Sequence, residues 1–173
     1  MPDKTETSAA FKKELEKFIE RELYPKVERF KEQITRSNGS PKYVNRLGVL
    51  YAKYGLNNKA EAEFNKVLNQ FEYVPALINM GNLKYLQNDA AGSLEFYSRA
   101  EVMEPENPTV LVAIARANHE LENYGTVTES YNLLKELDPE LAEKFAYLEL
   151  RGDEAARASN AANQKEIVVW NEN

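Results

Sequence analysis

Apolar positions recur every three or four residues over most of the chain, which is the spacing of amphipathic α-helices. Near the N-terminus they form one stripe among mixed Lys, Arg and Glu, made of Phe11, Leu15, Phe18, Ile19, Leu23, Val27, Phe30 and Ile34. The stripe predicts an amphipathic helix or kinked helix pair over residues 8–36, preceded by a flexible N-terminus at residues 1–7. Pro25 lacks an amide hydrogen and crowds the turn before it, so we expect a kink or break near Tyr24.

Between residues 41 and 141 the pattern repeats. Prolines able to open helices stand at positions 41, 75, 108 and 139, with spacings of 34, 33 and 31 residues. The residues before them include Ser40, Asn107 and Asp138, whose side chains can accept hydrogen bonds from the first free amides of a helix. These positions therefore predict capped helix starts, while Val74 before Pro75 is a weaker cap.

Each repeat places a tiny residue in its first segment and an aromatic ring 16 residues later in its second. The tiny residues are Gly48, Gly81 and Ala115, and the rings are Phe64, Tyr97 and Tyr131. We expect each ring to fill the gap that the tiny residue leaves between two helices. Between the segments lie residues that tolerate a left-handed backbone, at Gly55–Asn58, Asn88–Asp89 and Asn123–Gly125. Each repeat thus predicts a helix, a tight turn and a second helix.

On these residues the sequence resembles the tetratricopeptide repeat (TPR) family, with units at about 41–73, 74–107 and 108–141. The resemblance implies an all-α fold, a right-handed α-solenoid of TPR helix-turn-helix repeats with an N-terminal amphipathic helix and a C-terminal capping helix. The pattern departs from the family at Lys84 and Asn118, where an aromatic or aliphatic residue is usual. An ordinary helical bundle with regularly spaced prolines is the alternative.

After the three repeats (41–141), residues 142–162 have the pattern of a degenerate repeat or capping helices, which would cover the last apolar face. Residues 163–173 form a tail that contains the apolar segment Ile167–Trp170. Such a segment is expected to fold back onto the repeats, to pair with a neighbouring chain, or to be ordered only in a larger complex. Trp170 is the only tryptophan, so its fluorescence distinguishes these cases.

Composition narrows the function classes. The chain has 173 residues, 43% of them hydrophobic, with one histidine and no cysteine, which excludes disulfide scaffolds, cysteine-ligated zinc and multi-histidine sites. The net charge of -6 gives nucleic acids no general reason to bind. No stretch has the length and apolarity for direct membrane insertion, and no secretory signal opens the sequence. We expect a cytoplasmic protein if the chain is complete, and an undetermined compartment if it is a fragment.

The residues predict neither catalytic nor cofactor nor metal sites. The sequence has no Gly-rich phosphate loop, nucleophile elbow or HExxH motif. Paired carboxylates such as Glu61 and Glu63 are two positions apart and lie on different sides of a helix. We therefore expect a non-enzymatic protein whose function depends on surface shape.

The family resemblance implies a concave face lined by the first helix of each repeat, which binds a peptide or a partner protein. By helical phase, the residues on this face are Lys42, Asn45, Val49, Lys53, Ile78, Asn79, Asn82, Tyr85, Thr109, Val112, Arg116 and His119. We expect an extended or helical segment in this groove, with Asn82 and Arg116 as polar contacts. The carboxylate clamp of the chaperone-binding branch is not reproduced, because Asn79 matches it but Val49 and Thr109 do not.

Two alternatives remain at this stage. In the first, the concave face binds no partner, because it is either solvated or covered by the protein's own terminal helix or tail. In the second, the chain is a self-association module that forms homo-oligomers through its N-terminal stripe and its tail.

Overall fold

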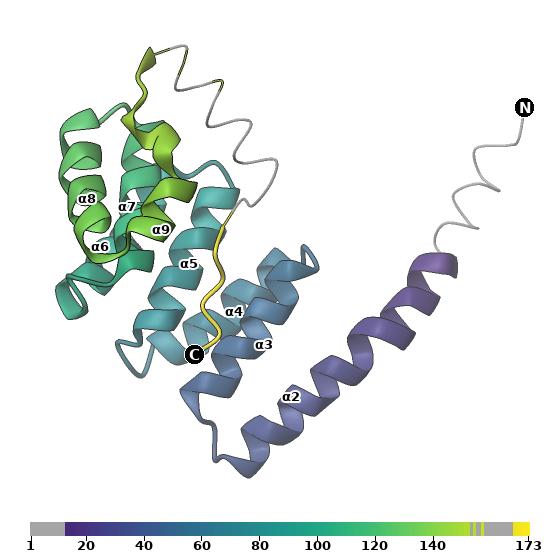
Figure 1. Cartoon of the computed structure of the whole chain (residues 1–173). Coiled ribbons are helices and arrows are strands. Elements are labelled where there is room, and N and C mark those ends of the chain that lie inside the picture. The colour runs from purple at the N-terminus through teal and green to yellow at the C-terminus, as the bar shows by residue number, and fades with distance from the viewer. Residues whose placement is uncertain (1–12, 153, 155–156, 158–167) are drawn as a thin grey trace, which may run out of the picture.

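The structure is a computed structural model that describes residues 13–152, 154, 157 and 168–173. Within these residues every regular element is helical, which confirms the all-α prediction. The elements are η1 (Ile19–Leu23), α2 (Tyr24–Arg36), α3 (Pro41–Lys53), α4 (Asn57–Leu68), α5 (Val74–Leu86), α6 (Ala90–Met103), α7 (Pro108–Glu120), α8 (Tyr124–Leu137), α9 (Pro139–Lys144) and η2 (Ala146–Glu149). From α2 to α9, each helix packs against the next one in sequence (Figure 1).

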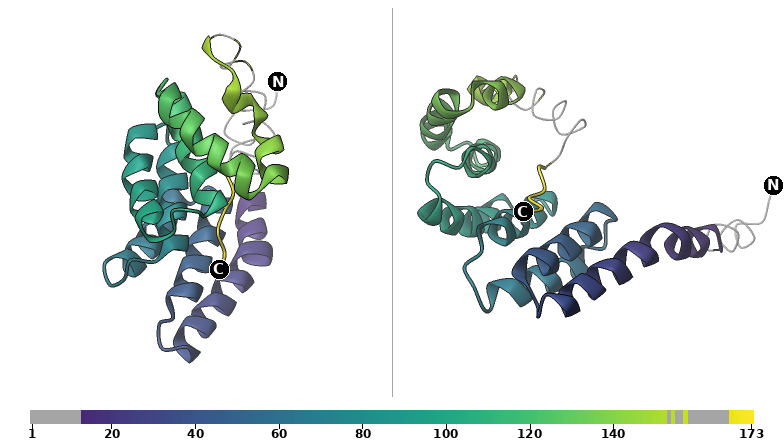
Figure 2. Two further views of the ribbon diagram at one scale, coloured as in Figure 1. Left: turned by 60° about the vertical axis from the view of Figure 1, so that its left-hand side comes forward. Right: turned by 60° about the horizontal axis from the view of Figure 1, so that its bottom comes forward.

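The helices form three antiparallel pairs, α3 with α4, α5 with α6 and α7 with α8. The first helices of the pairs also contact one another, α3 with α5 and α5 with α7. The pairs follow a curve, and Figure 2 shows the yellow end of the chain inside it. The central first helices are buried on nearly every side, since α5 and α7 each contribute ten buried residues. A consecutive stack of helix pairs, as in a helical repeat, explains why these two helices lack a broad solvent-exposed face.

Two glycines set the spacing within the first and second pairs. A Cβ atom at Gly48 would overlap the ring of Phe64, and one at Gly81 would overlap the ring of Tyr97. Both rings are almost completely buried. In these pairs the ring fills the space beside the tiny residue, as the sequence pattern predicts.

The predicted caps differ in outcome. Asn107 accepts hydrogen bonds from the amides of Thr109 and Val110 at 2.9 and 3.4 Å. Asp138 accepts one from Leu141 at 2.9 Å, so both caps are confirmed. Ser40 makes no side-chain cap bond, and that prediction is wrong.

The N-terminal helix continues through Pro25 without a break. The chain is helical from residue 13 to Arg36, and a π-helical turn, η1, stands directly before α2. Here the amide of Tyr24 donates to the carbonyl of Ile19, five residues back. The predicted break near Tyr24 is therefore absent, and the π-turn stands directly before Pro25, which has no amide hydrogen to donate. Leu23 and Val27 are buried against the first helix pair.

The third pair is followed by α9 and η2, which lie over its last apolar face. Ala142, Phe145 and Leu148 are buried there with residues of α7 and α8. Most of the last ten residues of the predicted degenerate repeat or capping helices (142–162) fall outside the described residues. None of the helices in the described part is both long and apolar enough to cross a membrane.

Candidate functional site

The inner face of the curve holds the segment Val168–Asn173, called here the terminal segment (Figures 1 and 2). It starts between α5 and α7, where Val168 packs against their buried residues. Trp170 then packs, partly buried, against the core beside α3. Near the end of the segment, Glu172 lies beside Arg46 and Lys53 of α3. Of the three alternatives for the tail, the structure therefore has the segment folded back onto the repeats.

Three asparagines of the inner helices bind the main chain of this segment. They are Asn45 of α3 with Asn79 and Asn82 of α5, and we call them the amide row. Asn45 and Asn79 are fully buried. All three are neutral and can both donate and accept, as a peptide main chain requires.

The centre of the amide row is Asn79, which forms two hydrogen bonds with one residue of the segment. Its Oδ1 accepts from the amide of Asn171 at 2.8 Å, and its Nδ2 donates to the carbonyl of the same residue at 2.7 Å. Asn45 Nδ2 donates to that carbonyl at 2.9 Å, while its Oδ1 accepts from Asn79 Nδ2 at 2.9 Å. The last contact fixes the orientation of both amides, because each oxygen and nitrogen has a defined partner.

Asn82 binds the segment two residues earlier. Its Nδ2 donates to the carbonyl of Val169 at 2.8 Å, and its Oδ1 accepts from the hydroxyl of Tyr97 at 2.8 Å. Tyr97 is 1% exposed, and burial raises its pKa, which keeps the hydroxyl a donor. Tyr97 thus fills the gap beside Gly81 and orients the amide that meets the segment.

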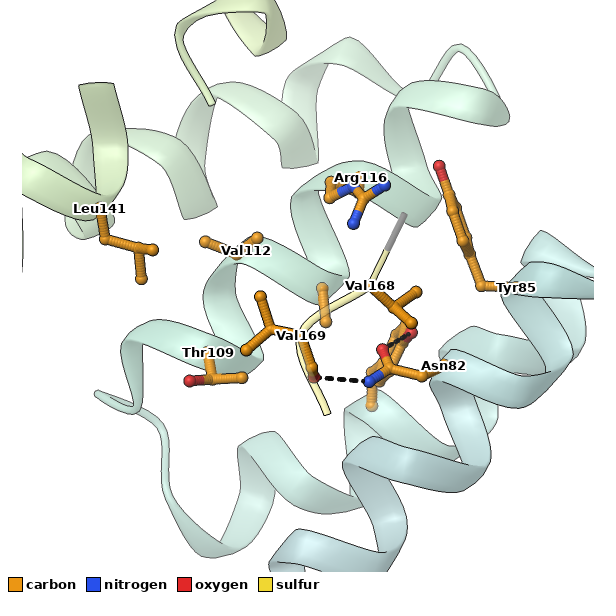
Figure 3. Close-up of a pocket in the computed structure, with 10 residues that line it drawn as sticks. Asn82, Tyr85, Thr109, Val112, Arg116, Leu141, Val168 and Val169 are labelled. Carbon is orange, nitrogen blue, oxygen red and sulfur yellow. Dashed lines mark hydrogen bonds between the residues drawn. The ribbon is translucent and has the colours of Figure 1, made fainter. Parts of the chain in front are cut away.

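One end of the groove is an aliphatic pocket. A cavity of about 40 Å³ remains there beside Val168 and Val169. Figure 3 shows these valines between α5 and α7, with Val169 near Val112 and Thr109. The lining of the pocket is completed by Asn82, Tyr85, Tyr97, Ala113, Arg116 and Leu141.

The other end is basic. Lys53 Nζ forms an ion pair with Glu172, and Arg46 lies 3.9 Å from the same carboxylate. We call Arg46 and Lys53 the cationic pair. The hydroxyl of Tyr73 donates to the main-chain oxygen of Asn173 at 2.6 Å. Both Lys53 and Glu172 are about half exposed, so water screens this contact more than the amide row.

Arg116 lies at the back of the aliphatic pocket and connects it to the C-terminal cap. Its guanidinium stands over the rings of Tyr85 and Phe145, and its Nε donates to the hydroxyl of Tyr147 at 3.1 Å. Burial raises the pKa of Tyr85 and of Tyr147, against the opposing effect of the Arg116 charge. Both hydroxyls stay neutral, and the cation is held by rings and hydrogen bonds.

The predicted concave residues fall into groups in the structure. Asn45, Lys53, Asn79 and Asn82 bind the terminal segment, and Tyr85, Thr109, Val112 and Arg116 line the aliphatic pocket. Val49 and Ile78 are buried in the core, and Lys42 is exposed. His119 packs edge-on against Tyr124 and Tyr147 near the cap.

Five groove residues are not among the predicted ones: Arg46, Tyr73, Tyr97, Ala113 and Leu141. Arg46 follows Asn45 and stands at the side of the inner face, while Tyr73 precedes α5. Neither has the helical phase of the groove. The sequence predicts only a packing role for Tyr97, and nothing in it signals that the hydroxyl also forms a hydrogen bond with Asn82.

Comparison with known proteins adds no assignment, since no protein-family model and no curated protein matches the sequence. Within the part of the chain that the structure describes, no group of three or more His, Cys, Asp or Glu residues is placed to hold a metal ion.

Proposed function

We propose that this chain is a non-catalytic protein-interaction module of the tetratricopeptide type, which binds an extended peptide segment of a partner protein in its inner groove. The observation that carries the proposal is the contact between the amide row and the main chain of the terminal segment. Amide and carbonyl groups are common to all peptides, so a site that pairs them is suited to protein ligands.

The repeat character supports the tetratricopeptide assignment. The helix pairs follow the proline spacing, and the ring of the second helix stands beside the glycine of the first in two of them. On this proposal the stack is a right-handed solenoid, and its inner face is the binding surface that such arrays offer.

The chemistry of the groove also supports binding over catalysis. Its central groups are carboxamides, which neither titrate nor act as nucleophiles at ordinary pH. Hydrogen bonds from Tyr97 to Asn82 and between Asn79 and Asn45 fix the orientation of these carboxamides, so they are preorganised to hold a ligand.

The test uses the 173-residue chain with residues 168–173 replaced by glycine and serine, which empties the groove and removes the only tryptophan. The probe is the acetylated and amidated hexapeptide VVWNEN. We expect saturable one-to-one binding, followed by the tryptophan fluorescence of the peptide. Asn79→Ala in the same chain should weaken binding at least about tenfold, because a buried group loses its partners.

Asn65→Ala is the matched control, because Asn65 is an exposed asparagine of α4. It should leave peptide binding unchanged. Absence of saturable binding in a chain with intact helical circular dichroism would contradict the proposal.

Self-association is the second candidate function, and one observation favours it. Leu15, Phe18 and Ile19 of the N-terminal apolar stripe are 41–45% exposed, so part of the stripe is uncovered. If this surface joins two copies, sedimentation should show a concentration-dependent dimer that Phe18→Glu abolishes. A monomer at all concentrations excludes this function and leaves the peptide proposal unaffected.

A further inference from the structure

We propose that the groove selects a protein segment that has two aliphatic residues at the places of Val168 and Val169 and an acidic residue directly after the position held by Asn79. The inference rests on the proposed function and adds the class of ligand. In this view the terminal segment, with the order Val168-Val169-Trp170-Asn171-Glu172, is a competitor within the chain for a partner segment of the same chemistry.

The first step is the register. Val169 and Asn171 are two residues apart, and the main-chain groups of both face the amide row. In an extended chain the groups of alternate residues point to the same side, and a shift by one residue reverses every side chain. A ligand therefore binds these amides in steps of two residues, and its side chains have fixed positions.

The second step is the acidic position. With Asn171 held by Asn79, the next side chain falls between Arg46 and Lys53. The protein as a whole carries a net charge of -6, so its general field disfavours an acidic ligand. The preference for an acid must come from this local contact, which lies at one end of the groove only.

The third step is the aliphatic pair. Val168 packs against the buried residues of α5 and α7, and Val169 stands beside Thr109 and Val112. β-Branched side chains favour the extended backbone that the register requires. The cavity of about 40 Å³ beside them leaves room for a longer aliphatic side chain, so isoleucine is also accepted.

The experiment compares peptides on the 173-residue chain whose residues 168–173 are glycine and serine. The probes are amidated VVWNEN, its forms with the changes Glu172→Gln and Glu172→Lys, a scrambled peptide and the free-acid form of VVWNEN. From the strength of exposed ion pairs we expect the glutamine form to bind about threefold and the lysine form about tenfold weaker. Introducing Lys53→Glu should reverse the order of the glutamate and lysine peptides.

The outcomes separate the two proposals. If the three peptides and the scrambled one bind equally, the ligand class is wrong and the groove still binds peptides. If no peptide binds to the folded chain, the proposed function itself fails. If only the free-acid form of VVWNEN binds, the groove reads a terminal carboxylate, and the acidic side chain is not the determinant.

The unmodified chain supplies the competition test. The competitor is the hexapeptide VVWNEN with the change Trp170→Phe, so that Trp170 of the chain is the only tryptophan in the sample. Added in excess, this peptide should displace the terminal segment and make Trp170 of the chain more accessible to acrylamide. If the unmodified chain is instead a dimer that Glu172→Lys dissociates, the occupant is the segment of a second copy, which overturns the assignment of a separate partner.

Discussion

The amide row and the cationic pair bind the same six-residue segment in different ways. Asn45 and Asn79 are fully buried and bind main-chain atoms, whereas Lys53 and its partner Glu172 are 48% and 44% exposed and meet through side chains. A buried polar group that loses its partner costs about 1–3 kcal/mol, while an exposed ion pair contributes about 0.2–1 kcal/mol. The amide row should therefore contribute more than the cationic pair to the free energy of docking of the terminal segment.

The largest expected effect comes from disrupting the packing of Gly81 against Tyr97, which supports the amide row. Gly81→Leu forces a side chain into the ring of Tyr97, and overpacking of this kind should lower the free energy of unfolding by about 3 kcal/mol or more. Urea denaturation followed by circular dichroism measures it. Gly125→Ala is the control, because nothing lies near its Cβ position, and it should leave stability unchanged or slightly higher. Equal stability of the two variants would contradict the packing described here.

The next effect concerns the amide row alone. In the 173-residue chain, Asn79→Ala should weaken docking of the terminal segment by about 2 kcal/mol, because Asn171 and Asn45 both lose hydrogen bonds. Acrylamide quenching of Trp170 and hydrogen exchange at the Asn171 amide should both increase. Asn65→Ala should change neither. If quenching stays the same in Asn79→Ala, the main-chain contacts do not hold the segment.

Tyr97 tests how the row is oriented. Tyr97→Phe keeps the ring beside Gly81 and removes the donor to Asn82, so docking should weaken by about 1 kcal/mol. Because burial raises the pKa of Tyr97 in the folded state, its contribution is present below about pH 10 and is lost as the pH rises further. One tyrosine of this kind lowers the free energy of unfolding by about 1.4 kcal/mol for each pH unit above its unfolded pKa. The free energy of unfolding of Tyr97→Phe should therefore fall less steeply above about pH 10 than that of the unmodified chain.

The exposed Tyr24 provides the control, and Tyr24→Phe should leave that pH profile unchanged. A fall of the same slope in Tyr97→Phe and in the unmodified chain would show that Tyr97 does not cause it.

The smallest effect is the response of docking to salt, which distinguishes the cationic pair from the amide row. Raising sodium chloride from about 0.05 to 1 M shortens the screening length to about 3 Å and should weaken docking by less than about 1 kcal/mol, through the cationic pair. Glu172→Gln should remove this salt dependence, whereas Asn79→Ala should keep it. Salt dependence that survives in Glu172→Gln would place the electrostatic contribution elsewhere.

Much of the fold follows from local signals in the sequence. The proline spacing and the caps at Asn107 and Asp138 predict helix starts, and Gly81 with Tyr97 predicts a close helix contact. The position of the left-handed residue in the third turn is not predicted. Glu122, with φ of 59°, takes the left-handed position in the third turn, although Asn123 and Gly125 are the usual residues there.

The site is predictable to a smaller extent. Helical phase places Asn45, Asn79 and Asn82 on one face, because a helix has a fixed period. It does not place Arg46, whose long side chain reaches the groove from the side, or Tyr73, which precedes its helix. The pairing of Asn79 with Asn171 spans 92 residues and depends on how the pairs curve, which no local pattern encodes.

The terminal segment also changes how the stack behaves as a whole. In a row of hairpins each unit is stabilised mainly by its neighbours, so such rows tend to melt stepwise from their ends. A six-residue strap that contacts α3, α5 and α7 together adds coupling between the first hairpin and the third. Occupancy of the groove by any peptide should therefore make the melting transition narrower as well as raise its midpoint temperature.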